Sequence, residues 1–552
     1  MTVGSPWKLI AGFALPVLLS QIFQQLYNTA DSLIVGRFLG DEALAAVSSS
    51  GPLIFLMTSF FEGLTLGAGV AISRYFGAGD DARVERAIHA NIFVNLLSGI
   101  FLTIFGVLLT PIILRWMGTD PEVLPDAISY FRYYFTGVLA VMLYNACKSV
   151  MNALGDSKRP LYYLLLSSAV NIALDILFIG GFGWGVWSAA VATVISQAIS
   201  MILCLIQLSR KTAKYRLRLS HLRADREMIG LILRYGLPSG VQNSVIGLAN
   251  VVVQTNINSF GKIAMAAYGT YSKLEGFAFL PITSFTMALT TYTSQNLGAC
   301  EYSRAKKGAR FGILSSIILA ELIGFAMYAF MPQLASLFSK TPDVITLATK
   351  QARTISLFFF LLAYSHAVAS VCRGAGKAFV PMAVMLAVWC VLRISYILLV
   401  MRFSHEIRYI YFAYPLTWSI CPARPAVSAA RASPSAARSK NMHAPKVFMK
   451  QTARRLSNLR STTRFSRRSM RSCRLRRRTS CCTSTIRSRN NIPFLSAPAN
   501  AGAIIPTPYR RSLRFAEASS FLQSRKRLWR KELALRPARP RRQSRRGHTL
   551  CA

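Results

Sequence analysis

Long apolar runs separated by short polar segments dominate the first 420 residues of the chain. A helix needs about 20 residues to cross a bilayer, and eleven runs reach roughly that length: 13–35, 52–73, 91–114, 131–151, 161–181, 186–208, 235–258, 274–296, 311–332, 354–372 and 379–401. A twelfth run starts near Tyr409 and stops at Ile420, which is too short to span. The pattern predicts an all-α polytopic membrane protein of twelve helices, the last of them truncated.

The second half of this apolar region repeats the first half. Short motifs recur 221 positions apart: Gly77-Ala78 with Gly298-Ala299, Pro121 with Pro342, and Ser149-Val150 with Ser370-Val371. Six spans is an even number, so both units enter the membrane from the same side, as parallel repeats with a cavity between two lobes. We expect an N-lobe at 1–221 with six helices, and a C-lobe at 222–420 with five helices and a truncated sixth. Transporters are commonly built in this way.

Basic residues are distributed unevenly between the two sides of the membrane. If the N-terminus is cytoplasmic, the inner segments hold about twice as many Lys and Arg residues as the outer segments, and segment 210–234 alone holds eight. The positive-inside rule therefore predicts a cytoplasmic N-terminus. We expect a monomeric, multi-pass protein of the bacterial inner membrane.

Composition separates the chain into two kinds of sequence. With 53% hydrophobic residues and a mean hydropathy of +0.37, it fits a membrane protein better than a soluble enzyme. The net charge of +44 is concentrated after residue 420, where 28 Arg and 5 Lys stand against 2 Glu and no Asp, which gives +31. The ten cysteines are scattered and form no CxxC pair, so we expect no metal centre and no cofactor.

Residues 421–552 break the repeat. The sixth span, 186–208, should be matched by about 407–429, but the match fails after Ile420. The Arg- and Ser-rich sequence that follows has low hydrophobicity and high charge, which predicts disorder. A genuine basic tail for nucleic acid or anionic lipid is one interpretation. We favour the other, a tail translated out of frame, because it interrupts a span that the repeat requires, and we expect no nucleic-acid partner.

Ionisable residues are few inside the apolar runs, where a charge is costly and is usually paired, neutralised or functional. They are Asp31, Glu62, Asp175, Lys273, Glu275, Glu321, His366 and Arg393. Arg393 breaks the repeat, since its counterpart is Ile172. We interpret Glu275, Glu321 and Arg393 as structural intramembrane charges, with Arg393 paired to one of the two acids.

Asp31 and Asp175 each have a polar residue one helical turn earlier. Tyr27 precedes Asp31 by four positions and Asn171 precedes Asp175 by four, so each pair shares a helix face. The first and fifth spans both run outward, and both acids lie near their outer ends. The second lobe has Val252 or Val253 and Tyr396 at the corresponding positions, so the chemistry is expected in the N-lobe only.

Two further residues fall at the same depth as the acids. At 1.5 Å per residue, Thr193 in the sixth span and Tyr130 at the mouth of the fourth reach the same slab of the outer leaflet. Two carboxyl groups with an amide, a hydroxyl and phenols predict an H⁺ or Na⁺ site. Na⁺ would be held by Asp31, Asp175, Asn171 and Thr193, whereas apolar surroundings and a second carboxylate favour a protonated acid.

Several motifs together resemble the multidrug and toxic compound extrusion (MATE) family, in particular its prokaryotic branch named for a DNA-damage-inducible member. They are LPVLLSQIFQQLYNTADSLIVGRFLG, SRYFGAGD, NALGDSKRP, NIALDILFI and SQNLGA with RAKKG. The resemblance covers about residues 7–420. It implies two six-helix bundles around a V-shaped cavity and an acid in the first helix, matched by Asp31. It also implies an acid in the fifth helix, matched by Asp175, with Asn171, Thr193, Tyr27 and Tyr130 as polar neighbours.

The resemblance also implies export of cationic or amphipathic small molecules in antiport with H⁺ or Na⁺, without enzymatic chemistry. The first alternative is a related flippase for a lipid-linked saccharide, which would line its cavity with basic residues to hold pyrophosphate. Only Arg393 is a candidate for that role in this chain. A second alternative, from another class, is a nucleic-acid-binding protein that acts through its basic tail.

Overall fold

The structure is a computed structural model, and it describes residues 1–116, 121–210, 214–404 and 406–420. These residues form helices joined by short loops, and no strand occurs among them. The expectations for the tail, 421–552, lie outside the described residues.

The first half contains six helical segments. They are α1 (Pro6–Leu39), α2 (Asp41–Ala78), α3 (Asp81–Trp116), α4 (Leu124–Thr136) with α5 (Val138–Leu154), α6 (Lys158–Asp175) with the π-helical η1 (Ile176–Gly181), and α7 (Trp187–Ser209). Helices α4 and α5 meet at Gly137 with a bend of 46°. A short 3₁₀ turn, η2 (Leu219–His221), lies in the segment that leads to the second half.

The second half repeats this order. Its segments are α8 (Arg226–Asn258), α9 (Lys262–Gly298), α10 (Tyr302–Ser336), α11 (Pro342–Ile355) with η3 (Ser356–Phe358) and α12 (Phe359–Gly374), α13 (Phe379–Met385) with the π-helical η4 (Leu386–Leu392) and α14 (Arg393–Phe403), and α15 (Ile407–Ile420). The described residues therefore contain the predicted twelve helical segments, the last of them described as far as Ile420.

Several helices begin well before the apolar run that predicted them. The run at 354–372 is preceded by α11, which starts at Pro342. This helix buries Val344, Ala348 and Ala352 on one face and exposes polar residues on the other, a spacing that suits an amphipathic helix. Mean hydropathy does not detect such a helix. The start of this segment was therefore predicted at residue 354, whereas the helix begins at Pro342.

Not every long helix is strongly apolar. Seven of the described helices, or eight if the bent pair α4–α5 forms one span, are long and apolar enough to cross a membrane. Helices α2, α8 and α9 are equally long but are not among them. They carry more polar side chains, such as Thr286, Thr290 and Ser294 of α9, which are buried. Together with α1, they form most of the contact between the two halves.

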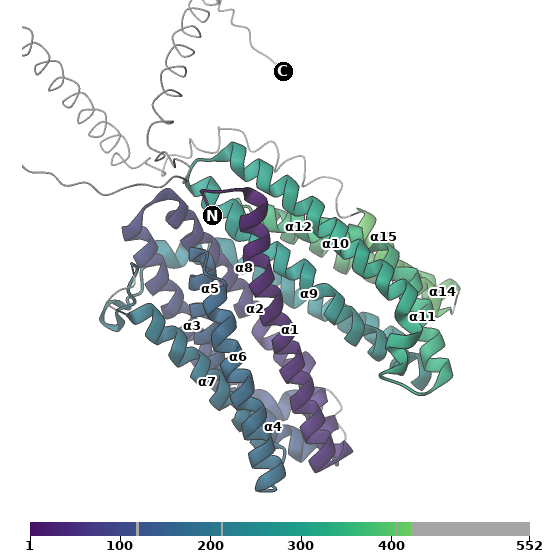
Figure 1. Cartoon of the computed structure of the whole chain (residues 1–552). Coiled ribbons are helices and arrows are strands. Elements are labelled where there is room, and N and C mark those ends of the chain that lie inside the picture. Colours follow the sequence, from purple (N-terminus) through teal and green to yellow (C-terminus); the bar gives the residue numbers. More distant parts are fainter. Residues whose placement is uncertain (117–120, 211–213, 405, 421–552) are drawn as a thin grey trace, which may run out of the picture. The chain divides into compact units, whose positions relative to one another are not determined.

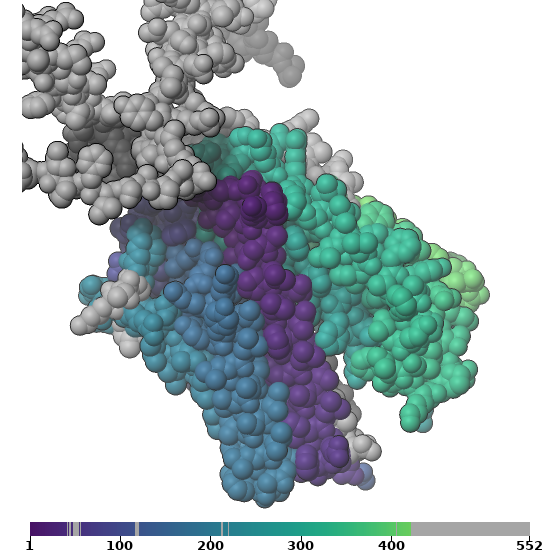
Figure 2. All heavy atoms as spheres, in the orientation of Figure 1, coloured from purple at the N-terminus to yellow at the C-terminus, as the bar shows by residue number. Residues whose placement is uncertain are grey.

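Helices α1–α7 and α8–α15 form two bundles, and Figure 1 shows them side by side. The main seams between them are α1 against α9, α2 against α8, and α2 against α9. In the first seam, Gln21 Oε1 accepts hydrogen bonds from the hydroxyls of Thr283 at 2.9 Å and Ser284 at 2.8 Å. The bundles touch at the end that holds the start of α1 and are separated at the opposite end (Figures 1 and 2).

Each bundle has its own apolar core. One core of the first bundle gathers Val35 of α1 with Phe131 and Phe135 of α4. The core of the second bundle includes Tyr271 and, from the short α15, Trp418. Only 2% of Trp418 is exposed, so even the truncated last segment contributes to the packing of its lobe.

Candidate functional site

The carboxyl groups of Asp31 and Asp175 meet inside the first bundle. Asp31 belongs to α1 and Asp175 is the last residue of α6, two helices that lie side by side (Figure 1). Both side chains are buried, with 8% of Asp31 and none of Asp175 exposed. The two groups are close enough to form a hydrogen bond with each other.

This contact needs a proton or a cation. Asp31 Oδ1 and both carboxyl oxygens of Asp175 have no hydrogen-bond donor among the described residues. Two ionised carboxylates are acceptors only, and in a low-dielectric interior their repulsion is strong. A proton on one acid would convert the repulsion into a hydrogen bond, and a bound cation would screen it.

Two tyrosines surround the pair. Tyr27 lies one turn before Asp31 on α1, and Tyr130 lies on α4; both are buried and interact electrostatically with both acids. The hydroxyl of Tyr27 accepts a hydrogen bond from Gln197 Nε2 of α7 at 3.3 Å. Four helical elements, α1, α4, α6 and α7, thus position the polar groups of the site.

Asn171 and Thr193 hold different places in this arrangement. Asn171 is fully buried one turn before Asp175, and neither of its amide atoms has a hydrogen-bond partner among the described residues. Thr193 is buried on α7, but in the described structure it forms no hydrogen bond with either carboxyl group. Gln197, one turn further on α7, donates instead to the hydroxyl of Tyr27, the neighbour of Asp31. Sequence reasoning missed Gln197, although its spacing of four from Thr193 placed it on the same face.

A change of helix type follows Asp175 directly. The α-helix α6 ends at Asp175 and the π-helical η1 begins at Ile176. Short π-helical segments are rare and frequently occur at functional sites. In the second lobe, η4 ends at Leu392 and the buried Arg393 follows, so a π-helical segment adjoins a buried ionisable residue in each lobe.

The partners of Arg393 differ from those expected. Its guanidinium donates hydrogen bonds from Nε and Nη2 to Thr417 Oγ1 at 3.3 and 2.9 Å, and it lies 4.5 Å from the ring centre of Tyr414. Within the described residues no ion pair joins it to Glu275 or Glu321. A hydroxyl and an aromatic face from α15 stabilise this charge, a combination that the repeat could not reveal because the counterpart of Arg393 is Ile172.

The two acids have other partners. Glu275 Oε1 accepts a hydrogen bond from the hydroxyl of Tyr271 at 3.2 Å and lies near Arg393. Glu321 Oε2 accepts one from the backbone N–H of Phe360 at 3.2 Å. Glu321 therefore ties α10 to the start of α12 and takes no part in the Arg393 cluster.

The sequence profile of the MatE family matches residues 16–177 and 238–399. One matched segment lies in each repeat, and the first includes both Asp31 and Asp175.

Individual relatives agree with the profile. The chain is 29% identical over 431 residues to the probable multidrug resistance protein YoeA of Bacillus subtilis strain 168, covering 75% of this chain and 92% of that protein. It is 28% identical over 379 residues to the probable multidrug resistance protein YpnP of the same organism, with coverages of 68% and 84%.

A solved structure shares the fold. A MOP superfamily transporter from Pyrococcus furiosus Vc1, whose binding pocket of reverse polarity suggests a different function, superposes with a TM-score of 0.73 at 23% identity. The superposition covers 77% of this chain and 96% of that one.

Proposed function

Because the chain belongs to the MatE family of membrane transporters, we propose that it is a secondary active exporter that expels amphipathic or cationic small molecules in exchange for H⁺ or Na⁺. It acts as a transporter and not as an enzyme. The direct contact between the buried carboxyl groups of Asp31 and Asp175 carries the proposal, since a transporter driven by a cation gradient needs an acidic site inside the membrane.

The site would couple the ion to the conformation of the N-lobe. With a proton or Na⁺ bound, the two acids attract each other through it and hold α1 against α6. When the ion leaves, the two charges repel each other, which favours a different arrangement of these helices. An ion that binds one arrangement more tightly shifts the population toward it, and drug release would follow that shift.

The named relatives support the substrate class. Both Bacillus subtilis proteins are described as probable multidrug resistance proteins. Acidic groups in the N-lobe suit molecules with a positive charge, and apolar walls suit their aromatic parts. We place the N-terminus and the segment that joins the two lobes in the cytoplasm, on the strength of the basic residues at 210–234.

Transport by the purified full chain in lipid vesicles tests the proposal. Vesicles loaded with a fluorescent cation receive either a pH gradient or a Na⁺ gradient. Faster dye movement with one gradient than with neither identifies both the activity and the coupling ion. Equal movement with and without both gradients, in vesicles shown to contain folded protein, would refute ion-coupled export.

A further inference from the structure

The start of α10 carries three exposed basic side chains at the head of an exposed apolar strip. Lys306, Lys307 and Arg310 lie within the first three turns of the helix. Exposed apolar side chains follow at helical spacings of three and four, and they are Phe311, Leu314, Ile318, Leu322 and Phe325. Residues three or four positions apart are neighbours on a helix surface. The charges and the apolar side chains therefore form one continuous surface, which we call the α10 strip.

The α10 strip lies at the surface of the second bundle (Figures 1 and 2). Of the seven described helices that are long and apolar enough to cross a membrane, α10 has the smallest buried share, 22% of its most apolar stretch. Lys306 to Arg310 span about 6 Å of the helix axis, which is close to the thickness of one headgroup layer, roughly 5–7 Å. The three charges therefore occupy the headgroup layer when the apolar side chains occupy the hydrocarbon core.

The equivalent positions of the first lobe bind another part of the protein. The offset of 221 relates Lys307 and Arg310 to Arg86 and His89 of α3. Arg86 donates hydrogen bonds to Asp225 at 2.7 and 3.1 Å. The buried His89 accepts one, at 3.1 Å, from a backbone N–H of the segment between the lobes. That segment therefore covers this surface of the first lobe and supplies its polar partners.

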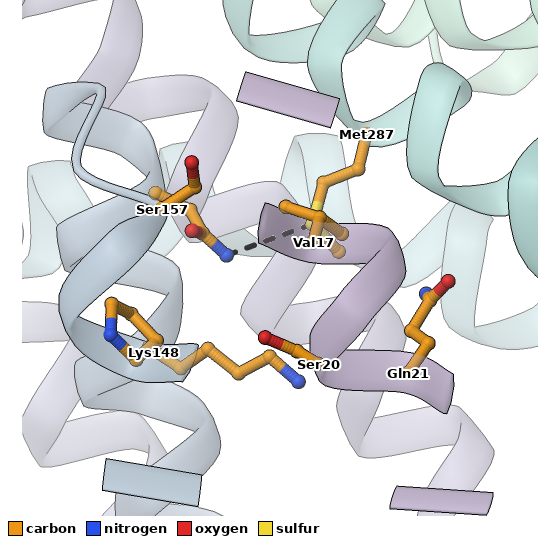
Figure 3. A pocket seen from close by; sticks show the side chains of 8 residues that line it. Val17, Ser20, Gln21, Lys148, Ser157 and Met287 are labelled. Carbon is orange, nitrogen blue, oxygen red and sulfur yellow. Dashed lines mark hydrogen bonds between the residues drawn. The ribbon is translucent and has the colours of Figure 1, made fainter. Parts of the chain in front are cut away.

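The three basic side chains of α10 have no such partner. None of them forms a hydrogen bond or an ion pair with another residue of the described structure. Lys148, by contrast, points from α5 into the seam between α1 and α9, toward Ser20 and Gln21 (Figure 3), so it is not part of a lipid-facing surface. Unpaired cations at headgroup depth attract an anion. The apolar part of the α10 strip favours a lipid over a soluble anion, because the acyl chains of a lipid continue from its phosphate.

We propose that Lys306, Lys307 and Arg310 bind the phosphate group of an anionic phospholipid such as phosphatidylglycerol, whose acyl chains pack along the α10 strip. Lys and Arg both donate charge-assisted hydrogen bonds to phosphate oxygens. The lipid holds this end of α10 in the headgroup layer, whereas the equivalent end of α3 is held by the protein itself. Binding of the lipid does not depend on transport, so this site and ion-coupled export can each fail without the other.

Thermal unfolding of the purified full chain in a non-ionic detergent measures the binding, because a ligand of the native state raises the melting temperature. Phosphatidylglycerol is titrated beside phosphatidylcholine, which has no net charge. Each basic residue near an anionic surface adds about a factor of five, so the double variant Lys307→Gln with Arg310→Gln should bind phosphatidylglycerol about 30-fold more weakly. Its response to phosphatidylcholine should not change. Lys307→Arg with Arg310→Lys keeps both charges and should bind within about threefold of the wild type.

The matched control is Lys340→Gln with Lys350→Gln, which removes two exposed lysines of the same lobe and should leave the affinity for phosphatidylglycerol unchanged. An equal loss in this control, or wild-type affinity in the Lys307→Gln, Arg310→Gln variant, would overturn the site. If that variant does not fold, Lys307→Gln alone should weaken binding about fivefold, and unchanged affinity would again overturn the site. Glycerol 3-phosphate carries the phosphate without acyl chains, so stabilisation by it equal to that by phosphatidylglycerol would identify a site for soluble phosphate and refute the lipid.

Discussion

Gly77 at the end of α2 and Gly298 at the end of α9 pack reciprocally against each other's helices. A methyl group on Gly77 would overlap the backbone carbonyl of Gln295, and one on Gly298 would overlap that of Arg74. Residues 74 and 295, like 77 and 298, are 221 positions apart, so the two contacts are equivalent. The two lobes therefore meet at this end through a pair of glycines related by the repeat.

Substitution of either glycine should prevent this end from closing. Gly77→Val places a side chain where α9 now lies, and overpacking of this kind typically costs about 1–3 kcal/mol. We expect a lower melting temperature and loss of gradient-driven efflux. The matched control is Gly276→Ala on α9, where a methyl group meets nothing within 4 Å. If Gly77→Val and Gly276→Ala showed equal efflux, transport would not require the close contact between α2 and α9 at this end.

The segment between the lobes provides a pH-dependent contact outside the membrane. Arg86 donates to Asp225 at 2.7 and 3.1 Å, and this contact, with the backbone N–H groups at the start of α8, lowers the pKa of Asp225. An acid whose pKa is lowered in the folded state stabilises the protein at pH values above its ordinary pKa, which is 3.8 for Asp225. This stabilisation is lost as the pH falls through the folded-state pKa. Both side chains are partly exposed, so screening keeps the contribution near 1 kcal/mol or less.

Asp225→Asn should therefore lower the melting temperature slightly at pH 7. The difference should shrink as the pH falls below 3.8 and vanish below the folded-state pKa of Asp225. Asparagine is also a good N-cap, so the variant isolates the charge. Thermal unfolding in detergent across this pH range measures it, with Asp126→Asn as an exposed control. A difference that persists at the lowest pH would indicate a loss of packing instead.

Most of the fold followed from the spacing of apolar residues and from the repeat. The constant offset between Gly77 and Gly298 predicted two parallel halves, and the glycines indeed occupy equivalent places. Helix ends were less predictable, because amphipathic extensions such as Pro342–Ile355 bury one face without raising the mean hydropathy.

The site was predictable where one helix carries two of its residues. Asp31 with Tyr27 and Asp175 with Asn171 follow from a spacing of four, and similar depth in the membrane predicted that the two acids would approach each other. The contact between Gln197 and Tyr27 depends on the rotation of α7 about its axis, which depth does not specify. Likewise, Arg393 was assigned acidic partners because charge is visible in sequence, whereas the ring of Tyr414 beside it depends on tertiary packing.

The orientation in the membrane can be measured directly. In a cysteine-free background, Arg223→Cys should be protected from an impermeant thiol reagent in intact cells, and Pro121→Cys should react. The reason is the positive charge at 210–234, which favours the cytoplasm. Permeabilised cells, in which both should react, provide the control, and the opposite pattern in intact cells would reverse the assigned orientation.

The coding DNA after codon 420 should contain the missing end of the last helix in another reading frame. The Bacillus subtilis relative YoeA is covered over 92% of its length by 75% of this chain, which leaves little of that protein to match the basic tail. One alternative frame should continue YFAYPLTWSI with about eight to ten apolar residues, enough to reach a spanning length. If neither frame does so, residues 421–552 are a genuine part of the protein.

Removal of either acid at the paired site should abolish ion-driven efflux. Asp31→Asn and Asp175→Asn keep the size and hydrogen-bonding capacity of the side chain but cannot ionise, so they separate charge from packing. Because one proton or cation is shared between the two carboxyl groups, each single variant should lose as much activity as the double variant, and the effects should not add.

Asp126→Asn, which replaces an exposed acid in the first turn of α4, is the matched control and should transport normally. Efflux of a fluorescent cation from vesicles is measured beside melting temperature, which should change by no more than the equivalent of about 1 kcal/mol. Near-normal efflux in one variant would remove that residue from the coupling mechanism, and near-normal efflux in both would show that the contact between Asp31 and Asp175 serves packing alone.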